Sequence, residues 1–500
     1  MIKNLMMILS ILIAFPFSLF ANNFPHIWTH GDDYWNLTGD IEQAKWLAKR
    51  HDLIVGAGIN EAVYDAMKIA NPNVKIMPYI AYNTYELDIQ NWIKNWCVQN
   101  GYNFEETFYH YYYDTQVKLR GTNPGTTLVR GYGGGTARTI QESRVPSSWA
   151  QYNNGINQQT GEITRLNICP TSIAWRRGYE QYALAQLMTI NAGRRKYSDG
   201  LFLDTFDGTV GDFYPQLERT IEMRNLRIST ASAAKVRAKQ DLITAMKELQ
   251  SFLTVKIGKT IVVSPNVGDI DYFYLWEKDF YADRSTDYAP PGVAVYIENM
   301  VRGGSNTSRI QRLKQTYDSM NQYGLVFICR NETTITNVSE RVKQFVIASH
   351  YLINHPNYCL MYHCGSASFY GGNPPGQLYT THWHKNLEYD LGTPVRRSGQ
   401  DAWGQTNTDR FFTFASVTSN LDSLQNYTIM GREYTNALVL AKFGSKGGIA
   451  NAGTNPTTHS LNGIYRLLLP DNSLGPAITQ ITLGASEGAI LIKTAQRPGA

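Results

Sequence analysis

The fold of this chain is decided by the stretch Tyr197-Ser198-Asp199-Gly200-Leu201-Phe202-Leu203-Asp204-Thr205-Phe206-Asp207-Gly208. A turn signal at Asp199-Gly200 leads into a short apolar run that ends abruptly in a carboxylate. This pattern is typical of a buried parallel strand that delivers an acid to the open end of its sheet. We therefore expect Asp204 at a strand tip and Asp207 on the loop above it. The alternative is that the two acids cap the helix that follows.

Outward from this stretch, short apolar segments that close on polar residues recur along the chain. They lie at 26–30, 53–56, 74–81, 201–204, 260–263, 293–297, 325–328 and 359–362. Helical stretches separate most of them, among them 41–50, 60–69, 170–190, 215–252, 308–320 and 338–353. Eight strand–helix units predict an α/β fold, a (β/α)8 TIM barrel over residues 22–384. A doubly wound open sheet is the alternative, although it does not need eight such units.

The rhythm breaks after the third strand, where residues 84–195 form a long insertion. An insertion of this length is more typical of a lid or cleft wall than of a linker. It contains an aromatic run at 108–113 and a glycine-rich segment at 131–135, which lacks the Lys-Ser/Thr of a phosphate-binding loop. We expect its tyrosines to offer stacking surface at one side of a cleft. The tyrosines concerned are Tyr109, Tyr111, Tyr112 and Tyr132.

From residue 385 to 500 the pattern changes to short strands separated by Gly, Asn, Pro and Ser turns. This pattern predicts a smaller antiparallel β-sandwich domain. It carries no catalytic constellation of its own.

The length of 500 residues favours one large domain and a smaller one, in agreement with this division. Aromatic residues make up 12% of the chain, which suits a sugar-binding cleft, although tyrosine is also an ordinary core residue. The formal net charge is only +5 and there is no Lys/Arg run. We therefore expect neither nucleic acid nor an anionic membrane surface as a partner.

The N-terminus has the features of a secretory signal. A lysine at position 3 precedes an apolar stretch that ends at Ala21. We expect residues 1–21 to be removed and the mature protein to be secreted or periplasmic, without stable membrane insertion. A membrane anchor is the alternative, but the run is marginal for spanning a bilayer.

The chain has five cysteines, too few and too scattered for a disulfide scaffold or a zinc module. Export permits a disulfide, and Cys359 and Cys364 could pair across a loop.

The polar residues at the strand ends are the candidate site, since barrel enzymes work at the C-terminal ends of their strands. Asp204 on the fourth strand and Glu298 after the sixth would face each other across the barrel mouth. Glycoside hydrolysis needs such a pair, one acid protonating the leaving oxygen and the other attacking the sugar or activating water. The expected substrate-binding residues are Asp32, Tyr79, Asn83, Asp207, Asn266, Arg330 and His363. We expect no cofactor.

These features resemble glycosyl hydrolases related to the polygalactosaminidase-type and α-galactosidase-like barrels. The resemblance rests on the Asp-Gly-Leu-Phe-Leu-Asp-Thr-Phe-Asp strand at 199–207, the Tyr-Ile-Glu-Asn at 296–299 and the Glu-Gly-Ala-Ile-Leu at 487–491. It implies that Asp204 is the nucleophile and Glu298 the proton donor, in a reaction that retains configuration. The long insertion and the Glu at strand six depart from the simplest members, so the identity of the substrate does not carry over.

Two other functions remain open. A metal-dependent hydrolase would need the scattered histidines to converge, but the His-x-His at 382–384 follows the last strand rather than the first. The candidate ligands are His26, His30, Asp32, His363, His382 and His384. A sugar-binding protein on a barrel that has lost catalysis is the other alternative, and only the presence of both acids argues against it.

Overall fold

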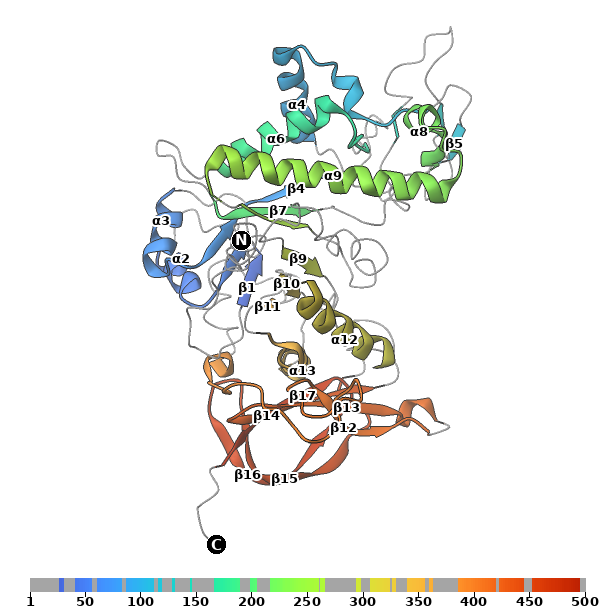
Figure 1. Ribbon diagram of the computed structural model, residues 1–500. Coiled ribbons are helices and arrows are strands. Elements are labelled where there is room, and N and C mark those ends of the chain that lie inside the picture. The colour runs from blue at the N-terminus through green and yellow to red at the C-terminus, as the bar shows by residue number, and fades with distance from the viewer. Residues whose placement is uncertain are drawn as a thin grey trace, which may run out of the picture. The chain divides into compact units, whose positions relative to one another are not determined.

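The structure is a computed structural model and is shown in Figure 1. It describes residues 27–30, 41–55, 61–82, 87–111, 116–118, 128–130, 144–145, 166–188, 198–204, 216–259, 261–265, 294–297, 306–323, 326–329, 340–355, 359–362, 385–419, 422–444 and 452–494. The chain divides into two compact units. Unit 1 comprises Met1–Ile76, Gly268–Asp271 and Ala294–Ala500, and unit 2 comprises Met77–Val267 and Tyr272–Val293.

Unit 1 contains a six-stranded sheet in the order β3-β2-β1-β11-β10-β9. Its strands are β1 (Ile27–His30), β2 (Leu53–Val55), β3 (Lys75–Met77), β9 (Ala294–Ile297), β10 (Val326–Cys329) and β11 (Cys359–Tyr362). The ladders of β1 with β2, β1 with β11, β10 with β11 and β9 with β10 are parallel. Strand β1 therefore lies directly between β2 and β11. This order is expected when successive strand–helix units bring the chain back to the strand with which it began.

Among the described residues of unit 1, helices follow several strands of this sheet. They are α2 (Ile41–Ala48), α3 (Glu61–Ala70), α12 (Asn306–Tyr323) and α13 (Glu340–Ile353). In α3 the buried residues Val63, Ala66 and Met67 recur at helical spacing, which gives the helix one apolar face. Three residues after the end of α2 lies a buried histidine, His51, whose Nδ1 donates to the Leu47 carbonyl at 2.9 Å. Burial lowers the pKa of His51 to about 4, so this ring is neutral and caps the helix without charge.

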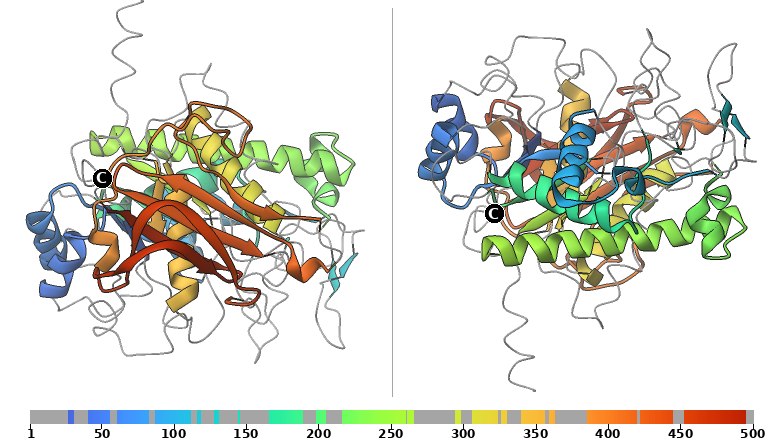
Figure 2. Two further views of the ribbon diagram at one scale, coloured as in Figure 1. Left: turned by 90° about the horizontal axis from the view of Figure 1, so that it is seen from below. Right: turned by 90° about the horizontal axis from the view of Figure 1, so that it is seen from above.

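The C-terminal strands form one antiparallel sheet in the order β12-β13-β14-β17-β15-β16 (Figure 2, left). They are β12 (Phe412–Val417), β13 (Tyr427–Glu433), β14 (Ala437–Gly444), β15 (Thr457–Leu468), β16 (Leu474–Leu483) and β17 (Glu487–Lys493), with short 3-10 turns η7 (Lys385–Glu388) and η8 (Ser423–Gln425). All six strands contribute to one core cluster, with Leu440 and Leu491 at its centre. The sequence predicted a sandwich of two sheets. The structure instead has a single curled sheet, because the register shift between Ser460 and Tyr465 lets the long β15–β16 hairpin bend over that core.

The other face of this sheet packs on helix α13. Phe345 of the helix meets Phe443 of β14 edge to face, with ring centroids 5.2 Å apart. Gly488 of β17 lies so close to α13 that a Cβ atom there would stand 2.5 Å from the Cβ of Ala348 and 2.7 Å from the Gln344 carbonyl oxygen. The strand and the helix can approach this closely only because position 488 has no side chain.

Two buried arginines also join the sheet to helices. Arg432 of β13 donates to the carbonyls of Tyr351, Leu352 and Asn354 at the C-terminal end of α13, and to that of Asp409. Arg309 of α12 donates to the Gly444 carbonyl at 2.9 Å and to Ser486 Oγ at 3.3 Å. Burial lowers the pKa of Arg309 to about 10, so it stays charged at neutral pH. The positive charge of Arg432 at the C-terminal end of α13 also interacts favourably with the helix dipole.

Unit 2 is built on a three-stranded parallel sheet in the order β4-β7-β8. Its strands are β4 (Tyr79–Ala81), β7 (Gly200–Asp204) and β8 (Val262–Pro265), and a separate hairpin is formed by β5 (Gln116–Lys118) and β6 (Leu128–Arg130). The helices are α4 (Leu87–Asn100), α6 (Ile173–Met188), α8 (Ile221–Asn225) and α9 (Ala231–Ile257), with 3-10 turns η3 (Phe104–Thr107) and η5 (Leu217–Arg219). Helix α6 contacts both α4 and α9 (Figure 1). Gly178 of α6 permits the contact with α4, since a Cβ there would lie 3.1 Å from Ile93 Cγ2.

Each predicted strand segment coincides with a strand, but the segment at 74–81 divides. Pro78 separates β3 from β4, because proline has no N–H for a ladder hydrogen bond. The Pro78 carbonyl still accepts a hydrogen bond from the Phe202 N–H at 2.9 Å. The two parallel sheets match the order expected of a (β/α)8 barrel, whose closure remains a prediction.

The helical stretch predicted at 215–252 also divides, into η5, α8 and α9. Thr220 caps α8 and Thr230 caps α9, each accepting a backbone N–H with its side chain. Helix α9 ends at Gly258, whose φ of +74° is the left-handed conformation that glycine adopts most readily.

Candidate active site

Strand β7 carries the first predicted catalytic acid at its carboxyl end. Leu201 and Leu203 are 0% exposed and Phe202 is 1% exposed, so the strand is buried on both faces. Asp204 is its last residue and pairs in register with Ala81 of β4. At the opposite end of the strand, Asp199 forms an ion pair with Lys259 at 3.6 Å. The apolar run thus separates two acids, one in an ion pair at the amino end and one at the carboxyl end, where barrel chemistry takes place.

Tyr79 lies in the same sheet and stacks on Phe202, with ring centroids 5.5 Å apart and an interplanar angle of 17°. It begins β4 instead of ending it, and it is half-buried. Tyr79 and Phe202 therefore form a stacked aromatic pair on one face of this sheet.

The carboxyl end of β4 is held in place by aromatic residues of α6. Tyr179 donates its hydroxyl to the Ala81 carbonyl at 2.6 Å. The ring of Tyr82 is buried and meets Tyr179 and Trp175 edge to face, at centroid distances of 4.9 and 6.2 Å. This packing fixes the backbone two residues before the predicted substrate ligand Asn83.

The other predicted site residues follow the ends of parallel strands by one to three residues. Glu298 comes directly after β9, Asn266 after β8, Arg330 after β10 and His363 after β11, while Asp32 follows β1, Asn83 follows β4 and Asp207 follows β7. Within the first sheet, Ile297 pairs with Cys329 and Cys329 with Met361, so β9, β10 and β11 end at nearly the same level. Glu298, Asp32, Asn83, Asp207, Asn266, Arg330 and His363 themselves lie outside the described residues.

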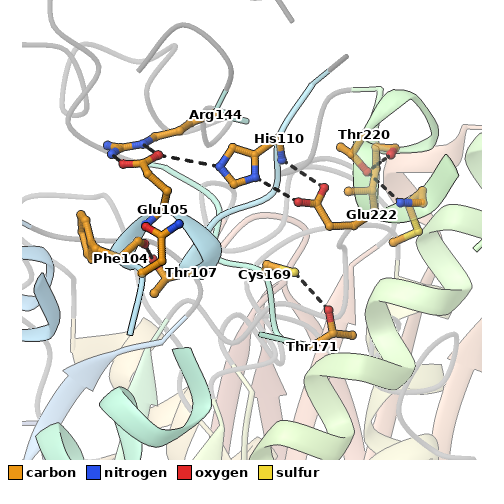
Figure 3. A network of polar contacts seen from close by, with 12 residues as sticks. Phe104, Glu105, Thr107, His110, Arg144, Cys169, Thr171, Thr220 and Glu222 are labelled. Carbon is orange, nitrogen blue, oxygen red and sulfur yellow. Dashed lines mark hydrogen bonds and ion pairs between the residues drawn. The ribbon is translucent and has the colours of Figure 1, made fainter. Parts of the chain in front are cut away.

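The best-defined charged cluster in unit 2 centres on His110, a residue that the sequence did not single out (Figure 3). Glu222 of α8 accepts from the His110 backbone N–H at 3.1 Å and from its Nδ1 at 3.0 Å. On the other side of the ring, His110 Nε2 lies 3.8 Å from Glu105 Oε2. Arg144 binds the same Glu105 carboxylate through its Nε at 3.0 Å and through a second guanidinium nitrogen. The cluster therefore joins the 3-10 turn η3, position 144 and α8.

These contacts keep His110 charged. Burial alone would lower the pKa of the imidazole, but the carboxylates of Glu105 and Glu222 outweigh it and raise the pKa to about 9. Burial likewise raises the pKa of Glu105, and the contacts with His110 and Arg144 outweigh it, so the net change is downward. A charged His110 thus lies between two carboxylates, one of which also binds Arg144. This cluster is built to hold the insertion against α8 rather than to exchange protons.

The aromatic run beside His110 has a different role from the one predicted. Tyr109 is 1% exposed and Tyr111 is 0% exposed, so neither can offer a stacking surface to a ligand. The reason is that backbone hydrogen bonds tie this segment to other parts of unit 2: Tyr109 N–H donates to the Asn167 carbonyl and Val145 N–H to the Tyr109 carbonyl. The two tyrosines are core residues of the insertion. Tyr112 and Tyr132, predicted with them, lie outside the described residues.

Neither described thiol is suited to nucleophilic chemistry. Burial raises the pKa of Cys97 to about 11 and that of Cys169 to about 12. Cys169 lies 3.1 Å from Thr171 Oγ1 in the interior. The predicted partners Cys359 and Cys364 are not covered, since the side chain of the first and the whole of the second lie outside what the structure describes.

Within the described part of the chain, no group of three or more His, Cys, Asp or Glu side chains is arranged to hold a metal ion. The histidine and aspartate ligands proposed for a metal site fall outside that part, and of His30 only the backbone, in β1, is described. The described helices also include none with the length and apolarity needed to cross a bilayer.

No protein-family model matches the sequence, and the curated proteins include no match. Similar solved structures include Amy13B of Eubacterium rectale, at 9% identity and a TM-score of 0.45 over 95% of this chain and 96% of that one. The GH27 β-L-arabinopyranosidase Abp of Geobacillus stearothermophilus is 9% identical, with a TM-score of 0.41 over 96% and 98% of the two chains. An endo-β1,6-glucanase is also 9% identical, with a TM-score of 0.39 over 94% and 92%. The last two are glycoside hydrolases by name.

Proposed function

We propose that this chain is a glycoside hydrolase that cleaves O-glycosidic bonds of an oligo- or polysaccharide with two carboxylates. Asp204 acts as the nucleophile and Glu298 as the acid that protonates the leaving oxygen. The proposal includes closure of the two parallel sheets into one (β/α)8 barrel. It also includes export of the mature enzyme after removal of residues 1–21.

The position of Asp204 carries this proposal. A carboxylate stands at the carboxyl end of β7, after three side chains that are at most 1% exposed. Such a strand cannot shift without exposing its leucines, so the acid has a rigid base. Glu298 is the residue directly after β9, so it too belongs to the carboxyl end of a parallel strand. Glycoside hydrolysis needs two carboxyl groups, and these two acids stand at the ends of different parallel strands.

The roles demand opposite protonation states. Asp204 must be ionised to attack the anomeric carbon, whereas Glu298 must hold its proton until the leaving group departs. A retaining reaction would place the carboxyl groups roughly 5–5.5 Å apart, and an inverting one about 6.5–9.5 Å apart to admit a water molecule. We propose retention, with the anomeric configuration of the first product as its test: NMR of freshly released sugar distinguishes the two outcomes before mutarotation.

The experiment that tests the function compares Asp204→Asn and Glu298→Gln with wild type on a polysaccharide library, with released reducing ends as the readout. Removal of the acid should lower the rate by about 10²–10⁴-fold, and loss of the nucleophile should lower it at least as much. Asp199→Asn is the matched control, because it changes an aspartate at the other end of the same strand. Wild-type activity that survives in Asp204→Asn would refute the assignment. A protein that binds a glycan yet releases no reducing ends would instead favour a non-catalytic carbohydrate-binding role.

A further inference from the structure

Outside the candidate active site, unit 2 carries a row of half-buried aromatic rings along the seam between α4 and α6. We define the aromatic strip as Trp92 and Trp96 of α4, Tyr102 just after α4, and Tyr182 of α6. Trp96 stacks on Tyr102 with centroids 5.1 Å apart and an interplanar angle of 17°. Trp92 meets Tyr182 at 5.5 Å. Helices α4 and α6 contact each other (Figure 1).

The strip is distinct from the core of α4. The residues that α4 buries are Ile89, Ile93 and Cys97, which recur at helical spacing on one face. Trp92 and Trp96 lie on the flank of that face and keep part of their rings accessible, and Tyr102 is 37% exposed. Large rings at the margin of a helix offer flat apolar area that a folded monomer does not need to expose.

The surroundings of the rings are polar but carry little free charge. Asn95 and Gln99 share a helix face with Trp92, at positions i+3 and i+7, and both are exposed. Arg177, which interacts electrostatically with Tyr102, forms an ion pair with Glu180 at 2.8 Å. The strip therefore combines ring faces with amide donors and acceptors, and Arg177 beside Tyr102 is already in an ion pair.

We propose that the aromatic strip binds a chain of an uncharged polysaccharide, away from the strand ends where cleavage takes place. Sugar rings present apolar C–H faces to aromatic rings, and their hydroxyls can exchange hydrogen bonds with the amides. An anionic glycan would call for unpaired cations, whereas Arg177, the described arginine beside Tyr102, is already paired with Glu180. Trp92 and Trp96 are four residues apart, about 6 Å along the helix axis, so successive units of a polymer can each meet a ring. The choice of a glycan as occupant rests on the proposed function.

Affinity electrophoresis tests the proposal without needing hydrolysis. Full-length Asp204→Asn protein is run in native gels that contain galactomannan, mixed-linkage β-glucan, soluble starch or, as the anionic comparison, polygalacturonate. We expect at least one neutral gel to retard the protein. Trp92→Ala and Tyr102→Ala, each added to this background, should weaken the retardation about tenfold, whereas Trp92→Phe should restore most of it. Val98→Ala is the matched control, because Val98 is 74% exposed on the same helix but lies outside the strip.

The outcomes separate the strip from the active site. Retardation that disappears in the two ring variants and persists in Val98→Ala supports the proposal. Unchanged retardation in the ring variants, no retardation in any neutral gel, or retardation by polygalacturonate alone overturns it. A concentration-dependent dimer that Trp92→Ala abolishes in size-exclusion chromatography also overturns it, since a second copy would then occupy the strip. If wild type hydrolyses no glycan but the retardation still depends on the aromatic strip, the proposed hydrolase function is refuted and glycan binding by the strip is supported.

Discussion

The charged state of His110 should make the stability of unit 2 fall with rising pH. The pKa of this imidazole is raised from an ordinary value of 6.5 to about 9, because Glu105 and Glu222 outweigh the effect of burial. The folded state therefore holds the proton more tightly than the unfolded chain. A group with a raised pKa contributes its full stability below pH 6.5 and loses it as the pH rises through 9. At about 1.4 kcal/mol for each pH unit, the contribution amounts to about 3 kcal/mol.

The measurement is urea unfolding of wild type and His110→Gln between pH 6 and 9.5, with hydrogen exchange of residues 104–111 and 221–225 as the local readout. Urea is preferred to guanidinium chloride, since the latter is a salt and screens the ion pairs under study. Wild type should lose about 3 kcal/mol across this range and His110→Gln much less, because glutamine does not titrate. Other groups that titrate in this range affect both proteins equally and cancel in the difference. Parallel loss of stability in the two proteins would refute the reasoning.

Two further predictions concern the sheet at the C-terminus. Arg432→Met should lower the free energy of unfolding by about 3 kcal/mol, since it leaves buried carbonyls at the end of α13 without a donor. The control Arg466→Met removes a half-buried arginine from the carbonyls of Leu474 and Gly475 and should lower the free energy of unfolding by about 1 kcal/mol. Equal losses for the two variants in urea unfolding would contradict this account. Gly488→Ala should cost at least about 2 kcal/mol, because the new Cβ meets backbone atoms of α13 at 2.7 and 2.9 Å. Gly463→Ala, where the added Cβ stands 3.4 Å from the Tyr465 side chain, is the control, and a melting temperature as high in Gly488→Ala as in this control would show that the helix can move away.

The strands of this fold could be predicted because their signals are local. A short apolar run that closes on a polar residue is visible without knowing its neighbours, and Asp204 is predicted at a strand end for that reason. The division of the 74–81 segment into two strands at Pro78 is also predictable from the sequence, since proline has no N–H to donate to a neighbouring strand. Strand pairing in the C-terminal region was harder. Alternating patterns show which residues face a core, but a bulge decides whether the strands form two sheets or one curled sheet.

The charged cluster at His110 could not be predicted, for a physical reason. Glu222 lies 112 residues after His110, and no spacing rule links two ionisable residues at that distance. The same holds for Tyr109 and Tyr111: an aromatic run reads equally well as a stacking surface or as a core. Only long-range pairing, of Tyr109 with the segments at 145 and 167 and of Tyr111 with Thr220, goes with their burial. For the site itself, the sequence could predict which strand ends carry acids, while the distance between them depends on contacts that no local pattern encodes.

The contact between α13 and the C-terminal sheet bears on how such a chain can be recombined with others. The helix relies on Arg432 to satisfy its last carbonyls and on Gly488 for a strand close enough to cover Phe345. A chain cut before residue 385 would leave these carbonyls and this ring in water. The sheet is therefore not an accessory that can be exchanged at a linker. A transferable segment would have to begin before α12, so that Arg309 and Phe345 travel together with the strands they pack against.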